Sequence, residues 1–268
     1  MPAGGALPST SDRPALFGGP TVDHPGVFRG AAGTAHPGSV VAAGDSIPIG
    51  TRYSADMTSW PRIHDTFLEV VDALPALVEG LDDVDRPALG EWNLRDLVGH
   101  LYRAVETVTE YLAAPEPTGA PLEGAAEYLV AYLEARDRDP DAVAAQITAR
   151  ARDELAGISP AAYPRRFLEA AAAARAALQG IPWDRKVASR MGPIRIADYL
   201  RTRSFEATVH GLDLARARGT PWRPPDDAVA DALVLLTEVA RRRGLGPDLL
   251  LALVGRTPVD PRAIPVLG

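Results

Sequence analysis

The chain has 268 residues, a formal net charge of −7 and a sequence pI near 5.3. An acidic chain without a run of basic residues is not typical of a general nucleic-acid-binding protein, so we expect no nucleic-acid partner. The chain contains no cysteine. Disulfides and thiolate metal ligands are therefore excluded, and any thiol chemistry would need a thiol supplied from outside.

Membrane insertion and secretion are also not expected. No segment is long and apolar enough to span a bilayer. The first residues have neither the basic start nor the apolar stretch of a signal peptide. We expect a cytoplasmic protein without a membrane partner.

Residues 1–56 differ in composition from the rest of the chain. Gly, Pro, Ser and Ala dominate this segment, and apolar residues do not recur at helical spacing. Such a segment buries too little apolar surface to offset the loss of chain entropy on folding. We therefore expect a disordered extension at 1–56 and a helical domain at 57–268.

The helical pattern begins near Arg62. Apolar residues then recur at helix spacing, and Pro75 is expected to kink or break this first helix. A second helix is expected to start with Asn93 as N-cap and Asp96 completing an acidic capping box, and to run to about Ala113. The apolar faces of the two helices consist of Phe67, Val70, Val71, Leu74, Leu77 and Val78, and of Leu97, Leu101, Val105, Val108 and Leu112.

The middle of the chain is rich in alanine, the residue with the highest helix propensity. Helices are expected near 123–136, 141–156 and 161–178. Lys186 to Ile194 is polar and is expected to form a loop or a short hairpin.

Three further helices are expected in the last part of the chain. The first runs from Ile196 to Arg218 with Gly219 as its C-cap. An amphipathic helix at 226–243 and a short apolar helix at 247–254 follow. Since no series of strands is evident, we predict an all-α protein built as an antiparallel four-helix bundle with additional short helices.

One stretch, residues 203–213, would place its polar side chains on one narrow stripe of a helix, because residues three or four apart lie above one another. These side chains are Arg203, Glu206, His210 and Asp213. Glu206 and His210, one turn apart, can both reach a divalent metal, and His100 is the candidate third ligand. Zn²⁺ suits this donor set and keeps a fourth position open, although Fe²⁺, Ni²⁺ and Mn²⁺ remain alternatives.

A simpler interpretation exists for each of these residues. A Glu/His pair four residues apart is common on solvated helix faces, and a lone histidine is more often hydrogen-bonded than a ligand. The neighbouring apolar residues favour a partly buried polar row, which needs partners or a metal. Arg203 and Asp213 could orient the ligands or help to bind substrate.

Trp92 and Trp183 are expected in the core or as helix staples.

Three segments resemble the mycothiol-dependent maleylpyruvate isomerase family of the DinB/YfiT-like superfamily. They are Trp92 to Leu101, Arg203 to Leu214, and Leu251 to Arg256. The resemblance spans roughly Met57 to the end of the chain. It implies a DinB-like four-helix bundle that binds a divalent metal, usually zinc, through His100, Glu206 and His210, with the thiolate of mycothiol near or on the metal.

The resemblance implies an enzyme that uses mycothiol on small electrophiles, by thiol transfer or by thiol-assisted isomerisation. The isomerase itself carries an additional C-terminal domain, and about fifty residues follow Gly219 here, which are too few for it. The resemblance therefore supports the helical scaffold and the metal site of the family more strongly than its isomerisation reaction. The alternative is a non-catalytic helical binding or regulatory module.

The sequence allows either a monomer or a homodimer, because the apolar run Leu233 to Leu236 suits an interface or a core.

Overall fold

The computed structural model describes residues 59–257. The predicted extension at 1–56 lies outside the described residues, so the division of the chain into two parts stays a prediction. Eight α-helices make up most of the described part and confirm the all-α class. They are α2 (Trp60–Val78), α3 (Leu94–Ala113), α4 (Ala125–Arg138), α5 (Pro140–Glu154), α6 (Tyr163–Leu178), α7 (Ile196–Arg218), α8 (Asp226–Arg242) and α9 (Gly246–Leu253). Within residues 59–257, none of these helices is long and apolar enough to cross a membrane.

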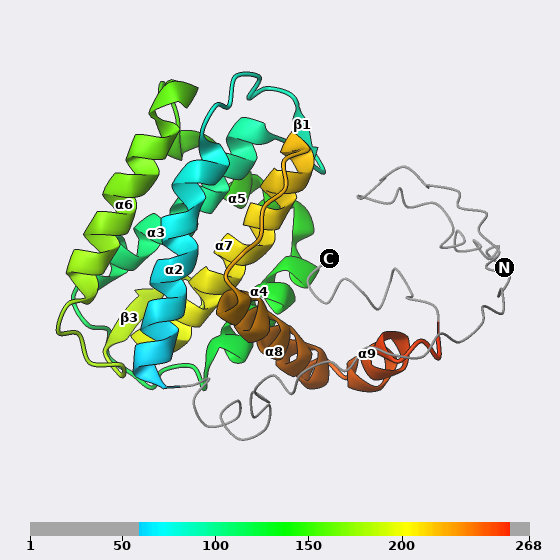
Figure 1. Ribbon diagram of the computed structural model, residues 1–268. Coiled ribbons are helices and arrows are strands. Elements are labelled where there is room, and N and C mark those ends of the chain that lie inside the picture. Colours follow the sequence, from blue (N-terminus) through cyan, green and yellow to red (C-terminus); the bar gives the residue numbers. More distant parts are fainter. Residues whose placement is uncertain (1–58, 258–268) are drawn as a thin grey trace, which may run out of the picture. The chain divides into compact units, whose positions relative to one another are not determined.

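Four helices, α2, α3, α6 and α7, form the central bundle (Figure 1). α2 packs against α6 and α7, and α3 packs against the same two helices. α3 and α7 run antiparallel: His100 faces Glu206 near the start of α3, and Thr107, farther along, accepts a hydrogen bond from Tyr199. The remaining helices surround this bundle, with α5 against α3, α8 against α7 and α4, and α9 against α8.

α3 and α6 run in the same direction, so the bundle is not antiparallel at every pair. Arg95 donates a hydrogen bond to Tyr163 at the starts of both helices, and Tyr102 packs edge-on against Phe167 farther along. The reason is connectivity. α4 and α5 lie between α3 and α6 in the chain, and a connection of that length does not force neighbouring helices to reverse direction.

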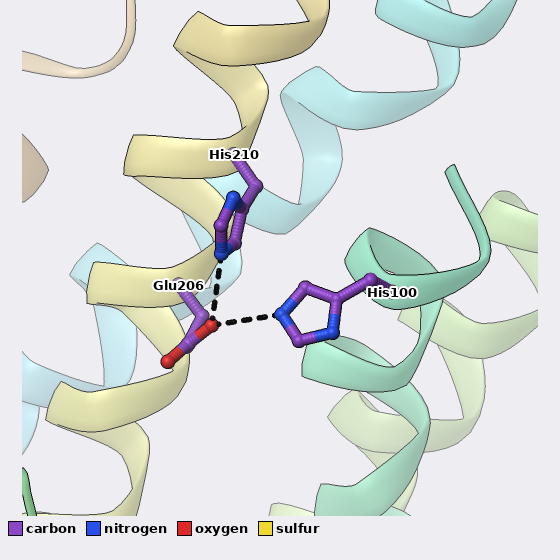
Figure 2. Close-up of side chains that lie close together, drawn as sticks. All are labelled: His100, Glu206 and His210. Atoms are coloured by element: carbon purple, nitrogen blue, oxygen red, sulfur yellow. Dashed lines mark hydrogen bonds and ion pairs between the residues drawn. The ribbon is translucent and has the colours of Figure 1, made fainter. Parts of the chain in front are cut away.

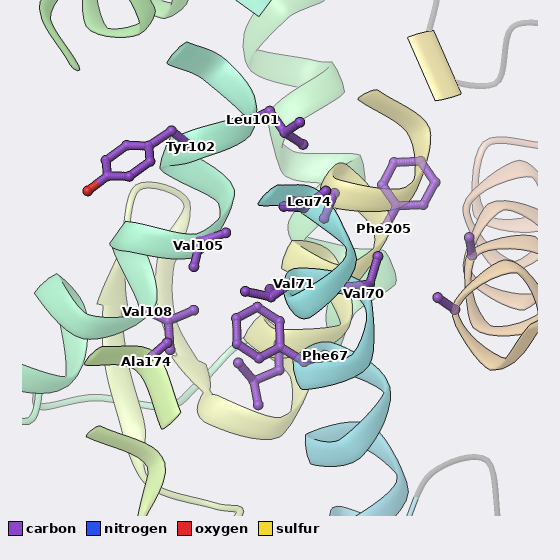
Figure 3. Close-up of a cluster of buried hydrophobic side chains, with 14 of the residues drawn as sticks. Phe67, Val70, Val71, Leu74, Leu101, Tyr102, Val105, Val108, Ala174 and Phe205 are labelled. Carbon is purple, nitrogen blue, oxygen red and sulfur yellow. The ribbon is translucent and has the colours of Figure 1, made fainter. Parts of the chain in front are cut away.

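The core contains the predicted apolar faces of α2 and α3 (Figure 3). The side chains of these faces interdigitate with those of α6 and α7, and most are completely inaccessible to solvent. They include Phe67, Val70, Val71, Leu74, Leu97, Leu101, Val105 and Val108. Burial of each such side chain contributes about 1.5–3 kcal/mol, and this fixes the helices that carry the polar stripe.

Two short hairpins lead into bundle helices. β1 (Pro87–Leu89) pairs with β2 (Trp92–Asn93) directly before α3, and β3 (Lys186–Ser189) pairs with β4 (Gly192–Arg195) directly before α7. The second lies where a loop or a short hairpin was predicted, and it is a hairpin. The first hairpin was not predicted, because its strands pair at only two positions and so short a ladder leaves almost no periodic signal.

The helix ends follow the predicted caps, with two differences. Asn93 accepts a hydrogen bond from the Asp96 amide at 2.9 Å, but the Asp96 carboxylate binds Arg152 of α5 instead of completing a capping box. Gly219 adopts the left-handed conformation that ends α7. Of the predicted kink or break at Pro75, the break does not occur: α2 continues to Val78, because a proline in the last turn removes only one hydrogen bond and here lies in the core.

Candidate metal centre

Three side chains from two antiparallel helices converge at one point (Figure 2). His100 Nε2 of α3 lies 3.1 Å from Glu206 Oε2 of α7, and His210 Nε2 lies 3.3 Å from the same oxygen. One donor atom from each residue lies within 4.8 Å of the others. Among residues 59–257, this is the one group of three His, Cys, Asp or Glu side chains that converges in this way.

Helix geometry explains the convergence. Glu206 and His210 are four residues apart on α7, so their side chains lie one above the other. α3 presents His100 from across the interface, with its ring at 88° to that of His210 and 4.7 Å between the ring centroids. All three side chains are about one-fifth exposed, at 20%, 20% and 19% for His100, Glu206 and His210. The cluster is therefore partly buried but still open to solvent.

The three groups differ in protonation. Burial alone would raise the pKa of Glu206, but hydrogen bonds from His100 and His210 outweigh burial and hold it well below the usual value. Burial would lower the pKa of His210, but its hydrogen bonds to Asp213 and Glu206 raise it to about 9. Burial lowers the pKa of His100. Near neutral pH the cluster holds a carboxylate, an imidazolium and a neutral imidazole. Both histidines donate to Glu206 through Nε2, so a metal would have to displace the Nε2 proton of each.

Asp213 contacts the cluster from the far side of His210. Its Oδ2 lies 3.1 Å from His210 Nδ1. A carboxylate on one imidazole nitrogen holds the ring in place and leaves the other nitrogen free for a metal. This contact is the one expected of a residue that orients a ligand.

Arg203 lies one helical turn before Glu206 and makes no hydrogen bond to the three clustered residues. Its guanidinium carbon lies 4.9 Å from the ring centroid of Tyr199 and 5.8 Å from that of Tyr128. Nε donates to Thr202 Oγ1, while the two terminal nitrogens have no hydrogen-bond partner among the described residues. Arg203 therefore acts on the cluster through its charge. The N–H groups of its two terminal nitrogens remain able to donate hydrogen bonds to another group.

Trp92 was not expected at the site, yet it forms one wall of it. Its ring centroid lies 5.0 Å from that of His100 and 6.4 Å from that of His210. The indole Nε1 donates to Thr148 Oγ1 of α5 at 2.8 Å. No local signal in the sequence indicates this role, because it depends on how β2 and α5 pack. Trp183, predicted in the core or as a helix staple, is 53% exposed, so it is not a core residue.

The donor set fits a divalent metal. Two imidazole nitrogens and one carboxylate oxygen are the protein ligands of many catalytic zinc sites, and the remaining position is left for water or substrate. In such sites a carboxylate usually accepts a hydrogen bond from the second ring nitrogen of a ligating histidine, and Asp213 has this place behind His210. The arrangement could bind a metal and present it to a small molecule.

Comparison with known proteins identifies a family. The family model described as the mycothiol maleylpyruvate isomerase N-terminal domain matches residues 67–215, which is more than half of the chain. The matched region contains His100, Glu206, His210 and Asp213. It ends before the segment 251–256, so the resemblance there is not part of the match. No curated protein and no solved structure matches the chain.

Proposed function

Because the chain belongs to the family of the mycothiol maleylpyruvate isomerase N-terminal domain, we propose that it is a metal-dependent enzyme that uses mycothiol. Its substrates are small electrophiles, and its reaction is thiol transfer or thiol-assisted isomerisation. The observation that carries this proposal is the convergence of His100 Nε2, His210 Nε2 and Glu206 Oε2 on one point.

The three converging residues hold the metal, which we propose to be zinc. Bound there, zinc lowers the pKa of a thiol that it coordinates and so provides a nucleophile at neutral pH. Asp213 keeps the His210 ring oriented and directs its Nε2 toward the metal position. The chain has no cysteine of its own, so no internal thiol competes with an external one for the site.

Arg203 and Trp92 act on the substrate side of the site. The Arg203 guanidinium, stacked on Tyr199, keeps a positive charge one turn from Glu206 and offers its terminal nitrogens to an anionic group such as a carboxylate. The Trp92 ring lies against His100 and limits the approach of water on that side. We propose Arg203 as a substrate-binding residue and Trp92 as a positioning residue.

Elemental analysis tests the metal site. Purified wild-type protein should contain about one metal ion per chain, the stoichiometry of a single three-ligand site. His210→Ala should lose it while the helix content by circular dichroism stays the same. His64→Ala is the matched control, because His64 lies on α2, outside the cluster, and pairs with its neighbour Asp65. Wild-type protein that takes up no metal after zinc is offered would contradict the proposal.

Thiol binding tests the chemistry. Cobalt(II) in place of zinc makes the site coloured, and mycothiol should then add a sulfur-to-cobalt charge-transfer band in the wild-type protein but not in His210→Ala. A protein that binds cobalt but shows no spectral change with mycothiol would favour the alternative, a non-catalytic helical binding or regulatory module.

A further inference from the structure

The outward face of α8 carries an apolar patch at its midpoint. Leu233 is 59% and Val234 49% exposed, whereas Leu235 and Val239 are buried against the bundle. α8 is anchored to α7 by the ion pair of Asp231 with Arg201, at 2.8 Å, and both side chains are mostly buried. The patch therefore lies on a rigid surface of the bundle.

α9 continues from the end of α8 and adds to the exposed apolar surface (Figure 1). It has eight residues, none of them buried. Leu250 and Leu253 are 62% and 72% exposed. A helix this short is not stable in water by itself, and neighbouring exposed apolar residues mark an interaction surface.

The exposed stripe of α8 is complementary to itself. Its members are, in order, Asp226, Ala230, Leu233, Val234, Thr237 and Arg241, of which Ala230 is half-buried and the others are exposed. They lie three or four residues apart except for the adjacent pair Leu233 and Val234. The midpoint of this stripe falls between Leu233 and Val234. Asp226 stands at one end of the stripe and Arg241 at the other, so the two ends carry opposite charge.

We propose that this chain forms a homodimer through α8, with the two helices antiparallel about a two-fold axis between Leu233 and Val234. In this arrangement the apolar pairs of the two copies meet at the axis, and Asp226 lies opposite the partner's Arg241. A parallel arrangement would place like charges together. Two-fold dimers need one surface that matches its own copy, and the order of apolar and charged residues along this stripe satisfies that condition.

Local ion pairs do not remove this complementarity. Asp226 binds Arg223 and Arg241 binds Glu238 within the same chain. The Asp226 and Arg241 side chains are nevertheless 80% and 68% exposed, so each has room for a second partner. None of the α8 or α9 residues belongs to the metal cluster, and dimer formation therefore does not depend on the proposed activity.

Cysteine cross-linking tests the position of the axis, and the absence of natural cysteines makes the result unambiguous. Under mild oxidation, Val234→Cys should give a disulfide-linked dimer in high yield. Leu168→Cys, at an equally exposed apolar position on α6, is the matched control and should remain mostly monomeric on a denaturing gel.

The same chemistry tests the direction of the helices. In the antiparallel dimer, two copies of residue 226 lie about 22 Å apart along the helix axis, so Asp226→Cys alone should not cross-link. A mixture of Asp226→Cys chains and Arg241→Cys chains should give a mixed dimer. Efficient cross-linking of Asp226→Cys to itself would rule out the antiparallel arrangement.

Sedimentation equilibrium on the full chain gives an independent readout. We expect a wild-type dimer, an increase of at least about tenfold in the dimer dissociation constant for Val234→Glu, and no change for Leu168→Glu, because a buried unpaired charge is costly only at the interface. A wild-type protein that is monomeric at all concentrations, or a dimer whose dissociation constant does not change in Val234→Glu, would overturn the proposal. The face would then be covered by another part of this chain or by a different partner.

Discussion

At the scale of single residues, the cluster is defined by how His210 is held between two carboxylates. Glu206 lies on its Nε2 side and Asp213 on its Nδ1 side. A metal would replace the contact between His210 Nε2 and Glu206, whereas the contact between His210 Nδ1 and Asp213 would remain. The two carboxylates should therefore have different effects on metal binding, even though both now raise the pKa of His210.

Asp213→Asn separates these effects. The amide can still accept a hydrogen bond from His210 Nδ1 but carries no charge, so the ring becomes a weaker base and a weaker ligand. We expect the zinc affinity to fall about 10–100-fold, as is usual for the loss of such a partner, with the stoichiometry at saturation unchanged. Competition with a chelator measures the affinity. Equal affinities of variant and wild type would show that Asp213 does not support the metal.

A second residue-scale feature lies on α3, outside the cluster. Burial raises the pKa of Glu106 to about 7, and a hydrogen bond shared with Glu154 adds to the shift. Folded protein thus holds this proton more tightly than unfolded protein does. Protonation of Glu106 therefore stabilises the folded state. This contribution is complete below about pH 4.5 and is lost as the pH rises through about 7.

Glu106→Gln should remove this dependence, because the amide does not titrate. We expect the free energy of unfolding of the variant, minus that of the wild type, to increase from pH 4.5 to 7. The slope is at most about 1.4 kcal/mol per pH unit, the value for one proton. Denaturant titrations at several pH values measure it. Curves that run parallel for the two proteins would mean that Glu106 has an ordinary pKa.

At the scale of elements, the site depends on the close approach of α5 to α3. Gly99, directly before His100, has no side chain, and a Cβ there would lie 2.0 Å from the Ala151 carbonyl oxygen. α5 also supplies Thr148, which binds Trp92 beside the cluster. The glycine therefore sets the position of α5, and α5 in turn holds one wall of the site.

Gly99→Ala should push the two helices apart. We expect a loss of stability of about 1–3 kcal/mol, the range for overpacked cores, and a change in tryptophan fluorescence, to which Trp92 contributes. Gly246→Ala is the matched control, since its added Cβ meets nothing closer than 3.7 Å. Equal stabilities of Gly99→Ala and wild type would show that α5 can move without cost.

At the scale of the whole molecule, a metal in the cluster would join α3 to α7. A ligand that binds only the folded state stabilises it, by about 2.7 kcal/mol at a hundred times the dissociation constant. Zinc should therefore raise the melting temperature of the wild-type protein and leave that of His210→Ala unchanged. Thermal unfolding by circular dichroism measures both. An equal rise in the two proteins would indicate zinc binding elsewhere.

Most of the fold class and the candidate ligands could be predicted from the sequence. The bounds of α3 and α7 follow from Asn93 and Gly219, and the stripe on α7 follows from spacing alone. The hairpin at β3 and β4 is one of the two alternatives, loop or short hairpin, that the sequence indicates. These features depend on interactions within a few residues along the chain, which is the range over which caps, turns and helical periods act.

The sequence by itself therefore determined the helices and which residue types could bind a metal. Only the tertiary structure decided which of them meet. His100 and Glu206 are 106 positions apart, Trp92 reaches the cluster through the packing of α5, and the run at Leu233 is divided between an exposed and a buried face. Contacts of this kind depend on how whole helices pack, and helix packing is set by the sum of many buried side chains, which no local pattern of residues contains.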